Sequence, residues 1–222
     1  MRILSYNINR FSQEKLEKVL HTEADVYILP ELANQSLIRL PAGYSMEWMG
    51  DIDFKGLGMI WKSDMRIEIP QWFNPSHEYF LPLVIDGIFI IAAWPTKTEK
   101  NNPKSYPQIA LEAISEYIPY FKQYPVIISG DLNCYKGQSG ETKQFSIESI
   151  VDILSSNGFV SVYHQQTGEA LGKESTATYY HQFKENLPFF LDYTFTNIPV
   201  KEYRLLEWDV AVSDHVAQCF EI

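Results

Sequence analysis

The sequence predicts an α/β protein in which two mixed sheets pack together and helices cover their outer faces. Apolar runs of strand length and amphipathic segments of helical length both recur along the 222 residues. The predicted strands and helices do not alternate strictly along the chain. Two-residue turn signals also join some neighbouring strands directly into hairpins. A doubly wound parallel sheet is therefore not expected, because that fold places a helix between successive strands.

The first half of the chain contains several strand signals and one helix signal. The apolar run that begins at Asp25 stops at Pro30, which predicts the end of a buried strand. Ser12 is a suitable N-cap for a helix over residues 13–22. The pair Asp86-Gly87 predicts a tight hairpin turn. We expect strands over residues 2–8, 25–29, 44–49 and 58–61, and a hairpin over 83–92.

The second half contains two longer helical patterns and several strands. Apolar residues recur at helical spacing over 105–121 and 144–156, and Asn157-Gly158 is a typical C-terminal stop for the second helix. Residues 126–129 form a short apolar run that predicts a buried strand. The last quarter is rich in β-branched and aromatic residues and predicts four strands, in the segments TATYYHQF, FFLDYTFTN, YRLLEWDVAV and VAQCFEI.

Composition is that of an ordinary globular protein, with 45% apolar and 21% charged residues. Length and uniform composition predict one domain spanning residues 1–222. The net charge of −10 argues against a protein that holds a long polyphosphate chain by charge alone, because such binding needs clustered Lys and Arg. A small phosphorylated substrate remains compatible, since a bound cation can mediate between carboxylates and phosphate.

Location and assembly are predicted from what the sequence lacks. Two cysteines, Cys134 and Cys219, do not indicate a disulfide framework or a cysteine-based zinc site. We find neither a signal peptide pattern nor an apolar run long enough to cross a membrane. We therefore expect a cytoplasmic protein that does not associate with membranes and is a monomer by default.

Polar residues stand at or beside the ends of five apolar runs. Each alone is typical of a turn or a cap, and Asp131-Leu132-Asn133 alone is more often a turn than a site. Asp192 is harder to explain in this way, because an Asp inside a strand must be paired if it is buried. The five places hold Asn7, Glu31, Asp131 with Asn133, Asp192, and Asp214 with His215.

Together these residues are typical of a magnesium-dependent site for a phosphate ester. Mg²⁺ takes one or two protein carboxylates and fills its remaining positions with water and phosphate oxygens, and Glu31 is a candidate ligand. Asp131 and Asn133 are two positions apart, so an extended backbone would point both to one face. His215 supplies an imidazole that titrates near neutral pH, and Asp192 is a candidate to fix its tautomer.

Taken in order, the motifs SYN, PE, GDLN, LDYTF and SDH resemble the endonuclease/exonuclease/phosphatase superfamily, which has the deoxyribonuclease-I-like fold. The resemblance spans the chain from Ser5 to His215. It implies a four-layer α/β sandwich, with two mixed sheets face to face and helices on both outer faces. It also implies cleavage of a phosphate ester that depends on Mg²⁺ or Mn²⁺.

The resemblance assigns a role to each motif residue. Glu31, Asn7 and Asp214 are expected near the metal. Asp131 is expected to orient or deprotonate the attacking water. Asn133 and His215 are expected to contact the phosphate, with Asp192 as the partner of His215. The complete list of catalytic and metal residues implied in this way is Asp131, His215, Asp192, Asn133, Glu31, Asn7 and Asp214.

One departure from the family pattern lies at Trp94. Many members have a histidine at the end of the strand before the long helix, whereas this chain has Trp94 in IIAAWPTK. An indole cannot act as an acid at neutral pH. Trp94 is expected either to form a stacking wall for substrate or to pack in the core or rim. Tyr106 and His181 are candidates to replace the missing acid.

The substrate class stays open at this stage. We favour a phosphodiesterase acting on DNA, RNA or a nucleotide. A phosphomonoesterase or a lipid-headgroup or inositol-phosphate phosphatase is the alternative, and a binding protein that has lost turnover is a third. Lys97, Lys100 and Lys104 form a small basic cluster that is either a solvated loop or a phosphate-binding lip.

Overall fold

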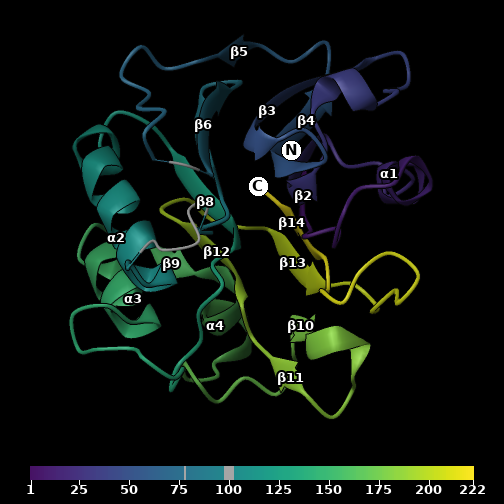
Figure 1. The fold of residues 1–222 in the computed structure, drawn as a ribbon. Coiled ribbons are helices and arrows are strands. Elements are labelled where there is room, and N and C mark those ends of the chain that lie inside the picture. The colour runs from purple at the N-terminus through teal and green to yellow at the C-terminus, as the bar shows by residue number, and fades with distance from the viewer. Residues whose placement is uncertain (78, 98–102) are drawn as a thin grey trace.

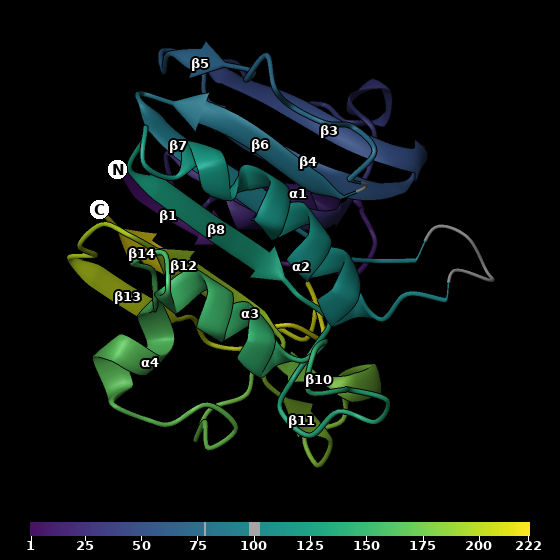
Figure 2. The same cartoon turned by 90° about the vertical axis from the view of Figure 1, so that its left-hand side faces the viewer.

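The computed structural model describes residues 1–77, 79–97 and 103–222. Within these residues, two six-stranded sheets lie face to face in the middle of the molecule (Figure 1). Helices α2 (Tyr106–Tyr117), α3 (Ile147–Ser155) and α4 (Val162–Thr167) cover the outer face of one sheet, and α1 (Gln13–Leu20) covers the outer face of the other (Figure 2). The order of layers is therefore helix, sheet, sheet, helix, as expected for a four-layer sandwich.

The first sheet joins the two ends of the chain. Its β1 and β2 are parallel, whereas β1 and β14 are antiparallel, with Arg2 opposite Glu221. In spatial order, the strands are β13 (Glu202–Leu205), β14 (Gln218–Glu221), β1 (Arg2–Ser5), β2 (Val26–Leu32), β4 (Lys55–Lys62) and β3 (Tyr44–Ile52).

The second sheet is also mixed, with one parallel pair between β7 and β8. A separate two-stranded ribbon lies near the end of the sandwich and consists of β10 (Tyr179–Tyr180) and β11 (Pro188–Phe189). In spatial order, the six strands are β5 (Ile67–Glu68), β6 (Phe80–Ile85), β7 (Ile88–Ala93), β8 (Val126–Asp131), β12 (Asp192–Thr196) and β9 (Val160–Ser161).

Serine caps begin the three longest helices. The hydroxyls of Ser12, Ser105 and Ser146 each accept a backbone N–H of the first turn, which satisfies a donor that the helix leaves unpaired. The helices are α1 (Gln13–Leu20), α2 (Tyr106–Tyr117), α3 (Ile147–Ser155) and α4 (Val162–Thr167), with the 3₁₀ turns η1 (Gln35–Leu37), η2 (Ile118–Tyr120) and η3 (His181–Phe183).

Alternation along the strands divides the apolar residues among three cores. In β1, Ile3 packs between the sheets and Leu4 packs under α1. In β8, Ile127 packs between the sheets and Ile128 packs under α2 and α3. Successive side chains of a strand point to opposite faces, so each inner strand contributes to two cores. This arrangement explains why these strands read as continuous apolar runs in the sequence.

Most predicted elements are confirmed, with corrections at their ends. The Asp86-Gly87 turn has both residues at positive φ, as a two-residue hairpin turn requires. The prediction that Pro30 ends its strand was wrong, because β2 continues to Leu32 through an irregularity in its pairing with β4. Helix α3 begins at Ile147 rather than at residue 144. The short α4 was not predicted.

Among the described residues, no helix combines the length and apolarity needed to cross a membrane.

Candidate functional site

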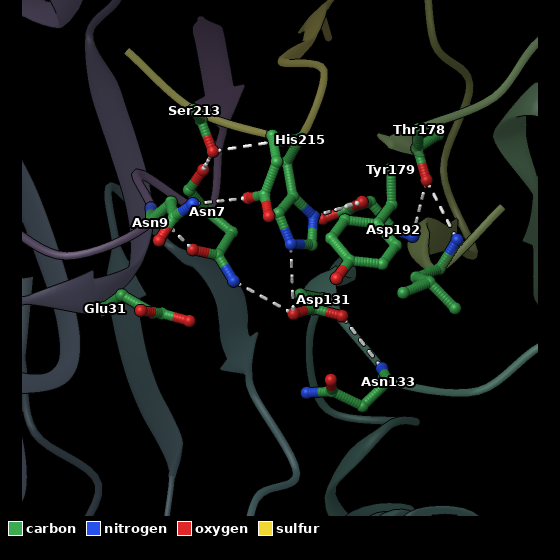
Figure 3. Close-up of polar contacts among 12 residues, drawn as sticks. Asn7, Asn9, Glu31, Asp131, Asn133, Thr178, Tyr179, Asp192, Ser213 and His215 are labelled. Atoms are coloured by element: carbon green, nitrogen blue, oxygen red, sulfur yellow. Dashed lines mark hydrogen bonds and ion pairs between the residues drawn. The ribbon is translucent and has the colours of Figure 1, made fainter. Parts of the chain in front are cut away.

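Polar side chains at or beside the ends of β1, β2, β8 and β12 come together from both sheets (Figure 3). Asn7 follows β1 and Glu31 lies near the end of β2, so both come from the first sheet. In the second sheet, β8 ends at Asp131 and its antiparallel neighbour β12 begins at Asp192. The register pairs these two aspartates directly, which places two carboxylates opposite each other.

Gly130 allows the backbone to present Asp131. Its φ is 150°, and a Cβ built on it would lie 1.9 Å from the carbonyl oxygen of Ala93 on β7. Real Cβ atoms do not approach oxygen so closely, so a side chain at residue 130 would force β7 and β8 apart. The glycine of the GDLN motif therefore has a backbone role beside the site.

Asp131 is buried and held by two donors. The Asn7 Nδ2 donates to its Oδ2 at 3.0 Å, and the backbone N–H of Asn133 donates to its Oδ1 at 2.8 Å. Burial, aided by the negative charge of Asp192, raises the pKa of Asp131 to about 7, although the nearby His215 opposes this rise. A carboxyl group with such a pKa can exchange a proton near neutral pH.

His215 lies between the two aspartates. Its Nδ1 is 2.9 Å from Asp192 Oδ2, and its Nε2 is 3.9 Å from Asp131 Oδ2. Burial alone would lower the pKa of His215, but the charges of Asp192 and Asp131 outweigh it and raise the pKa to about 9. The imidazole is therefore held in its charged form, with the Nδ1 proton directed at Asp192.

Two buried hydroxyls hold the backbone around this histidine (Figure 3). Ser213 Oγ donates to the Asn7 carbonyl at 2.6 Å and accepts the N–H of His215 at 3.0 Å. Thr178 Oγ1 accepts the N–H of Asp192 at 3.0 Å. These contacts fasten the SDH segment to the end of β1 and the start of β12 to the Thr178 segment, so the site is preorganised by neutral groups.

Glu31 occupies the irregular end of β2. Its φ of 64° lies in the left-handed region, where a non-glycine residue is strained. Its Oε2 accepts the N–H of Arg10 at 3.1 Å and lies 3.7 Å from Lys55 Nζ. The side chain is 17% exposed, so this carboxylate lies closer to solvent than Asp131 does.

Asp214 is the second outer carboxylate. Its Oδ1 accepts the Asn9 Nδ2 at 2.8 Å. Burial raises the pKa of Asp214, while the positive charge of His215 opposes this and the negative charge of Glu31 adds to it. The negative charge of Glu31 therefore acts on the carboxyl group of Asp214.

The loop between β1 and α1 connects these outer carboxylates. Asn9 and Arg10 both have positive φ, 43° and 67°, which asparagine tolerates but which is unfavourable for arginine. Lys15 Nζ donates to three successive carbonyl groups of this loop, those of Ile8, Asn9 and Arg10, at 3.0, 2.7 and 3.2 Å. These three hydrogen bonds offset the strain and hold the loop in the conformation that contacts Glu31 and Asp214.

Asn133 is placed by a turn rather than by an extended strand, which corrects the reason given for its position. β8 ends at Asp131, and Asn133 has a φ of 52°. Its backbone N–H bonds to Asp131, and its Nδ2 donates to the Pro95 carbonyl at 3.2 Å. The same segment is thus both a turn and part of the site (Figure 3).

Trp94 packs in the core between the sheets. It is 3% exposed and lies edge-on to Tyr79, with ring centroids 5.0 Å apart. Lys55 Nζ lies 5.2 Å from the centre of its ring. This geometry agrees with the packing alternative for Trp94, because a ring so buried presents no open face to a substrate base.

The two proposed replacements for the missing acid lie in different places. Tyr106 begins α2 and lines a pocket of about 280 Å³ with Lys97, away from the aspartates. His181 is exposed, and its Nδ1 is 2.8 Å from the hydroxyl of Tyr179. Of the basic cluster, Lys104 pairs with Glu112 at 2.6 Å, and Lys100 lies outside the described residues.

Sequence reasoning did not identify Asn9, Lys15 or Tyr179. Asn9 follows Asn7 by two positions, the spacing that drew attention to Asp131 and Asn133, so this signal was available. Tyr179 forms an isolated bridge with His215, and their ring centroids are 4.6 Å apart. No sequence pattern reveals that pairing or the three contacts of Lys15, because both depend on how the chain folds back on itself.

Two groups of residues offer metal ligands. Asp131, Asp192 and His215 have ligand atoms within 4.8 Å of one another, but both ring nitrogens of His215 already face the carboxylates. A metal on this trio would displace the imidazole protons. Glu31 and Asp214 supply only oxygen atoms, which suit Mg²⁺ and Mn²⁺. By the type of ligand atom alone, the outer pair suits a hard divalent cation better than a trio that includes an imidazole.

Comparisons with known proteins find similarity in structure only. No protein-family model and no curated protein matches the chain. The 3' phosphatase NExo from Neisseria, bound to a product DNA hairpin, has a TM-score of 0.74 at 16% identity, covering 100% of this chain and 99% of its own. An AP endonuclease from Archaeoglobus fulgidus has a TM-score of 0.71 at 16% identity, covering 99% and 98%. The human Nocturnin catalytic domain, bound to sulfate, has a TM-score of 0.63 at 14% identity, covering 99% and 93%.

The chain thus has the fold of the endonuclease/exonuclease/phosphatase proteins, the deoxyribonuclease-I-like fold. The predicted resemblance and the four-layer α/β sandwich are confirmed at the level of architecture. The roles of individual residues rest on the geometry described above.

Proposed function

We propose that this protein is a Mg²⁺- or Mn²⁺-dependent phosphoesterase, and that its substrate is a phosphodiester in nucleic acid or a nucleotide. The observation that carries the proposal is the buried Asp131, positioned by Asn7 and facing His215, which is itself held by Asp192. This arrangement combines a proton acceptor with a fixed cationic donor, as hydrolysis of a phosphate ester requires.

Asp131 is the residue that activates water. Its pKa of about 7 lets the carboxylate take a proton from water and release it again near neutral pH. The amide donors from Asn7 and Asn133 fix both carboxylate oxygens, so the attacking water is oriented for in-line displacement at phosphorus. Asn133 also lies at the site as a candidate amide donor to a phosphate oxygen.

His215 contacts the phosphate in its charged form. Asp192 holds Nδ1, which leaves Nε2 directed at the centre of the site. An imidazolium there stabilises the negative charge that develops on the phosphate oxygens. Phosphoryl transfer depends mainly on such positioning and charge stabilisation, which this arrangement supplies.

Glu31 and Asp214 would hold the divalent cation. Asn7 joins this group to Asp131, because its Nδ2 bonds to Asp131 while its Oδ1 accepts the N–H of Asn9. When bound, the cation would neutralise charge on the phosphate and on the leaving oxygen. The presence of all these groups argues against a binding protein that has lost turnover.

The comparisons support nucleic acid as the substrate class. One structural neighbour is bound to a product DNA hairpin, and another is an AP endonuclease. The first is a 3' phosphatase, which makes a phosphomonoester on nucleic acid the second candidate substrate.

Three properties of the whole chain belong to this proposal. One domain over residues 1–222 is supported by the core between the sheets, which includes both Ile3 and Phe220. The cytoplasmic location and the monomeric state stay predictions from the sequence.

The test is a panel of esters assayed with Mg²⁺, with Mn²⁺ and with EDTA. The panel contains bis(p-nitrophenyl) phosphate, single-stranded DNA, abasic duplex DNA and an oligonucleotide with a terminal phosphate. We expect turnover that EDTA abolishes and that the Asp131→Asn variant lacks. Release of inorganic phosphate alone would favour the monoester, and absence of turnover on every ester with either metal would refute the proposal.

A further inference from the structure

In the proposed mechanism the charged imidazole of His215 contacts the phosphate, so no group has yet been assigned to protonate the leaving oxygen. An alkoxide expelled from a nucleotide is a strong base and needs a proton as it leaves. Trp94 cannot supply one, because its indole is buried in the core and does not ionise near neutral pH. His215 is directed by Asp192 toward Asp131, where the attacking water and the phosphate are expected.

Tyr179 lies next to His215 and carries a hydroxyl group that could donate a proton. It stands beside His215, joined to it by a β-bridge and by a ring contact with centroids 4.6 Å apart and planes at 40°. Figure 3 shows its ring next to the imidazole, with the hydroxyl on the Asp131 side of the site. The hydroxyl also lies 2.8 Å from Nδ1 of His181.

The carboxylates of the site also act electrostatically on the hydroxyl of Tyr179. Burial and the negative charges of Asp214, Asp131, Glu31 and Asp192 together raise the pKa of Tyr179 to about 12. The largest cause is burial, and the four charges follow it. A phenol keeps its proton at neutral pH and gives it up to a strongly basic oxygen that develops next to it. This property suits an alkoxide leaving group and not a weakly basic one.

We propose that Tyr179 is the catalytic acid of this site and that His181 restores its proton. The inference rests on the proposed phosphoesterase function. The oxygen of water bonds to phosphorus, and the water proton passes to Asp131. The bond from phosphorus to the leaving oxygen breaks with its electron pair on that oxygen, which takes the phenolic proton of Tyr179. The products are an alcohol and a phosphate ester with one ester bond fewer.

His181 completes the path from this acid to solvent. It is exposed on η3, directly after the ribbon strand that carries Tyr179. With a proton on Nδ1, the imidazole donates to the Tyr179 oxygen and leaves the phenolic proton free for the leaving oxygen. After transfer, Nδ1 gives its proton to the phenolate while Nε2 takes one from water. Two steps thus connect the buried site to bulk solvent.

The test compares two diesters that differ only in leaving group. p-Nitrophenyl thymidine phosphate releases a weakly basic phenolate, and dithymidine phosphate releases a strongly basic alkoxide. We expect Tyr179→Phe to lower kcat/KM about 100-fold more on the dithymidine substrate than on the aryl substrate, the range of a general acid. A loss of equal size on both substrates, or no loss on either, would overturn the inference.

A second measurement does not depend on a single substrate pair. In a series of aryl thymidine phosphates, the dependence of kcat/KM on the acidity of the phenol should be steeper for Tyr179→Phe than for the wild type. A residue that only packs against His215 would change the rates and not the slope. Tyr180→Phe is the matched control, because Tyr180 stacks on Trp208 with ring centroids 4.1 Å apart, and its slope should equal that of the wild type.

The role of His181 is tested by a double-mutant cycle. His181→Gln should show the same preference for the aryl leaving group, to a smaller extent, because water can reach the phenol from solvent. In the Tyr179→Phe background, the His181 substitution should have no further effect on the dithymidine substrate. Independent effects would exclude the relay. These outcomes all presuppose wild-type turnover, so failure of the proposed function itself is recognised separately, by a wild type that hydrolyses neither diester.

Discussion

Asp131 and Asp192 are direct partners across β8 and β12, yet they hold His215 differently. Asp192 lies 2.9 Å from one ring nitrogen, whereas Asp131 lies 3.9 Å from the other. The short contact fixes the imidazole, and the longer one leaves Asp131 controlled by the donors of Asn7 and Asn133. Two neighbouring carboxylates thus have separate tasks, one in orienting a side chain and one in proton transfer.

Asp131→Asn should lower hydrolysis at least 100-fold, because an amide cannot accept the water proton. The substitution keeps the size of the side chain and removes a charge that burial disfavours, so the fold should persist. Steady-state kinetics and urea unfolding measure the two effects. Asp152→Asn, an exposed change on α3, is the control and should retain activity. A fully active Asp131→Asn enzyme would contradict the mechanism.

Asp192→Asn should lower the pKa of His215 from about 9 toward its ordinary value of 6.5. Burial already disfavours the charged imidazole, so its positive charge depends on the two aspartates. NMR titration of the His215 ring protons without divalent metal measures the change. Asp214→Asn should cause a smaller decrease, because Asp214 raises the pKa of His215 less than Asp192 does. An unchanged pKa in Asp192→Asn would show that the contact does not control the imidazole.

Lys15→Met should destabilise the protein and weaken Mn²⁺ binding. The loss of three hydrogen bonds to the loop carbonyls should lower the free energy of unfolding by about 2 kcal/mol. Arg10→Gly in the Lys15→Met background should recover about 1 kcal/mol, because glycine tolerates the φ of 67° at this residue. Urea unfolding and electron paramagnetic resonance of Mn²⁺ measure these changes.

The control for this experiment is Lys18→Met on the same helix. Lys18 is exposed and forms only a 4.0 Å surface pair with Glu14. Its loss should change stability by less than about 0.5 kcal/mol and leave Mn²⁺ binding unaltered. If Lys15→Met and Lys18→Met behaved alike, the loop would not depend on its three contacts with Lys15.

Glu174→Gln should destabilise the protein by an amount that depends on pH. Burial alone would raise the pKa of Glu174, but hydrogen bonds from His164 at 2.9 Å and Gly172 N–H at 2.8 Å outweigh it and lower the pKa below its ordinary value of 4.5. The carboxylate therefore contributes stability above pH 4.5, and this contribution is lost as the pH falls through the folded-state pKa.

Urea unfolding of wild type and Glu174→Gln across this pH range measures the effect. We expect a difference of about 1–3 kcal/mol at neutral pH that shrinks in acid. Glu14→Gln is the control, since that side chain is 83% exposed, and it should show no such trend. A difference that stays constant from neutral to acidic pH would show that the charge of Glu174 is not responsible.

The sequence predicted the layers of the fold because apolar alternation is a local property. The runs at β1, β2 and β8 and the cap at Ser12 could be recognised from neighbouring residues alone. The set of polar residues at strand ends was found in the same way. Only the ordered resemblance to a family predicted that these residues form one site. A local sequence pattern does not indicate that strands of different sheets end at the same place.

The features that the sequence did not predict depend on contacts between residues that are far apart in the chain. Pro30 did not stop β2, because tertiary pairing with β4 overrode its local effect. Asn133 reached the site through a left-handed turn and not through an extended strand. Tyr179 meets His215 only because the β10–β11 ribbon folds back over the SDH segment. These relationships join residues far apart in the chain, where periodicity carries no information.

The site draws Asn7 and Glu31 from one sheet and Asp131 and Asp192 from the other. Neither sheet alone can therefore maintain the geometry of the site. The apolar core between the two sheets sets the position of one sheet relative to the other. A cavity in that core would let the layers slide, and the reacting groups would lose alignment before the protein lost its fold. Changes in core packing between the sheets should therefore alter the rate of the reaction as well as the stability of the protein.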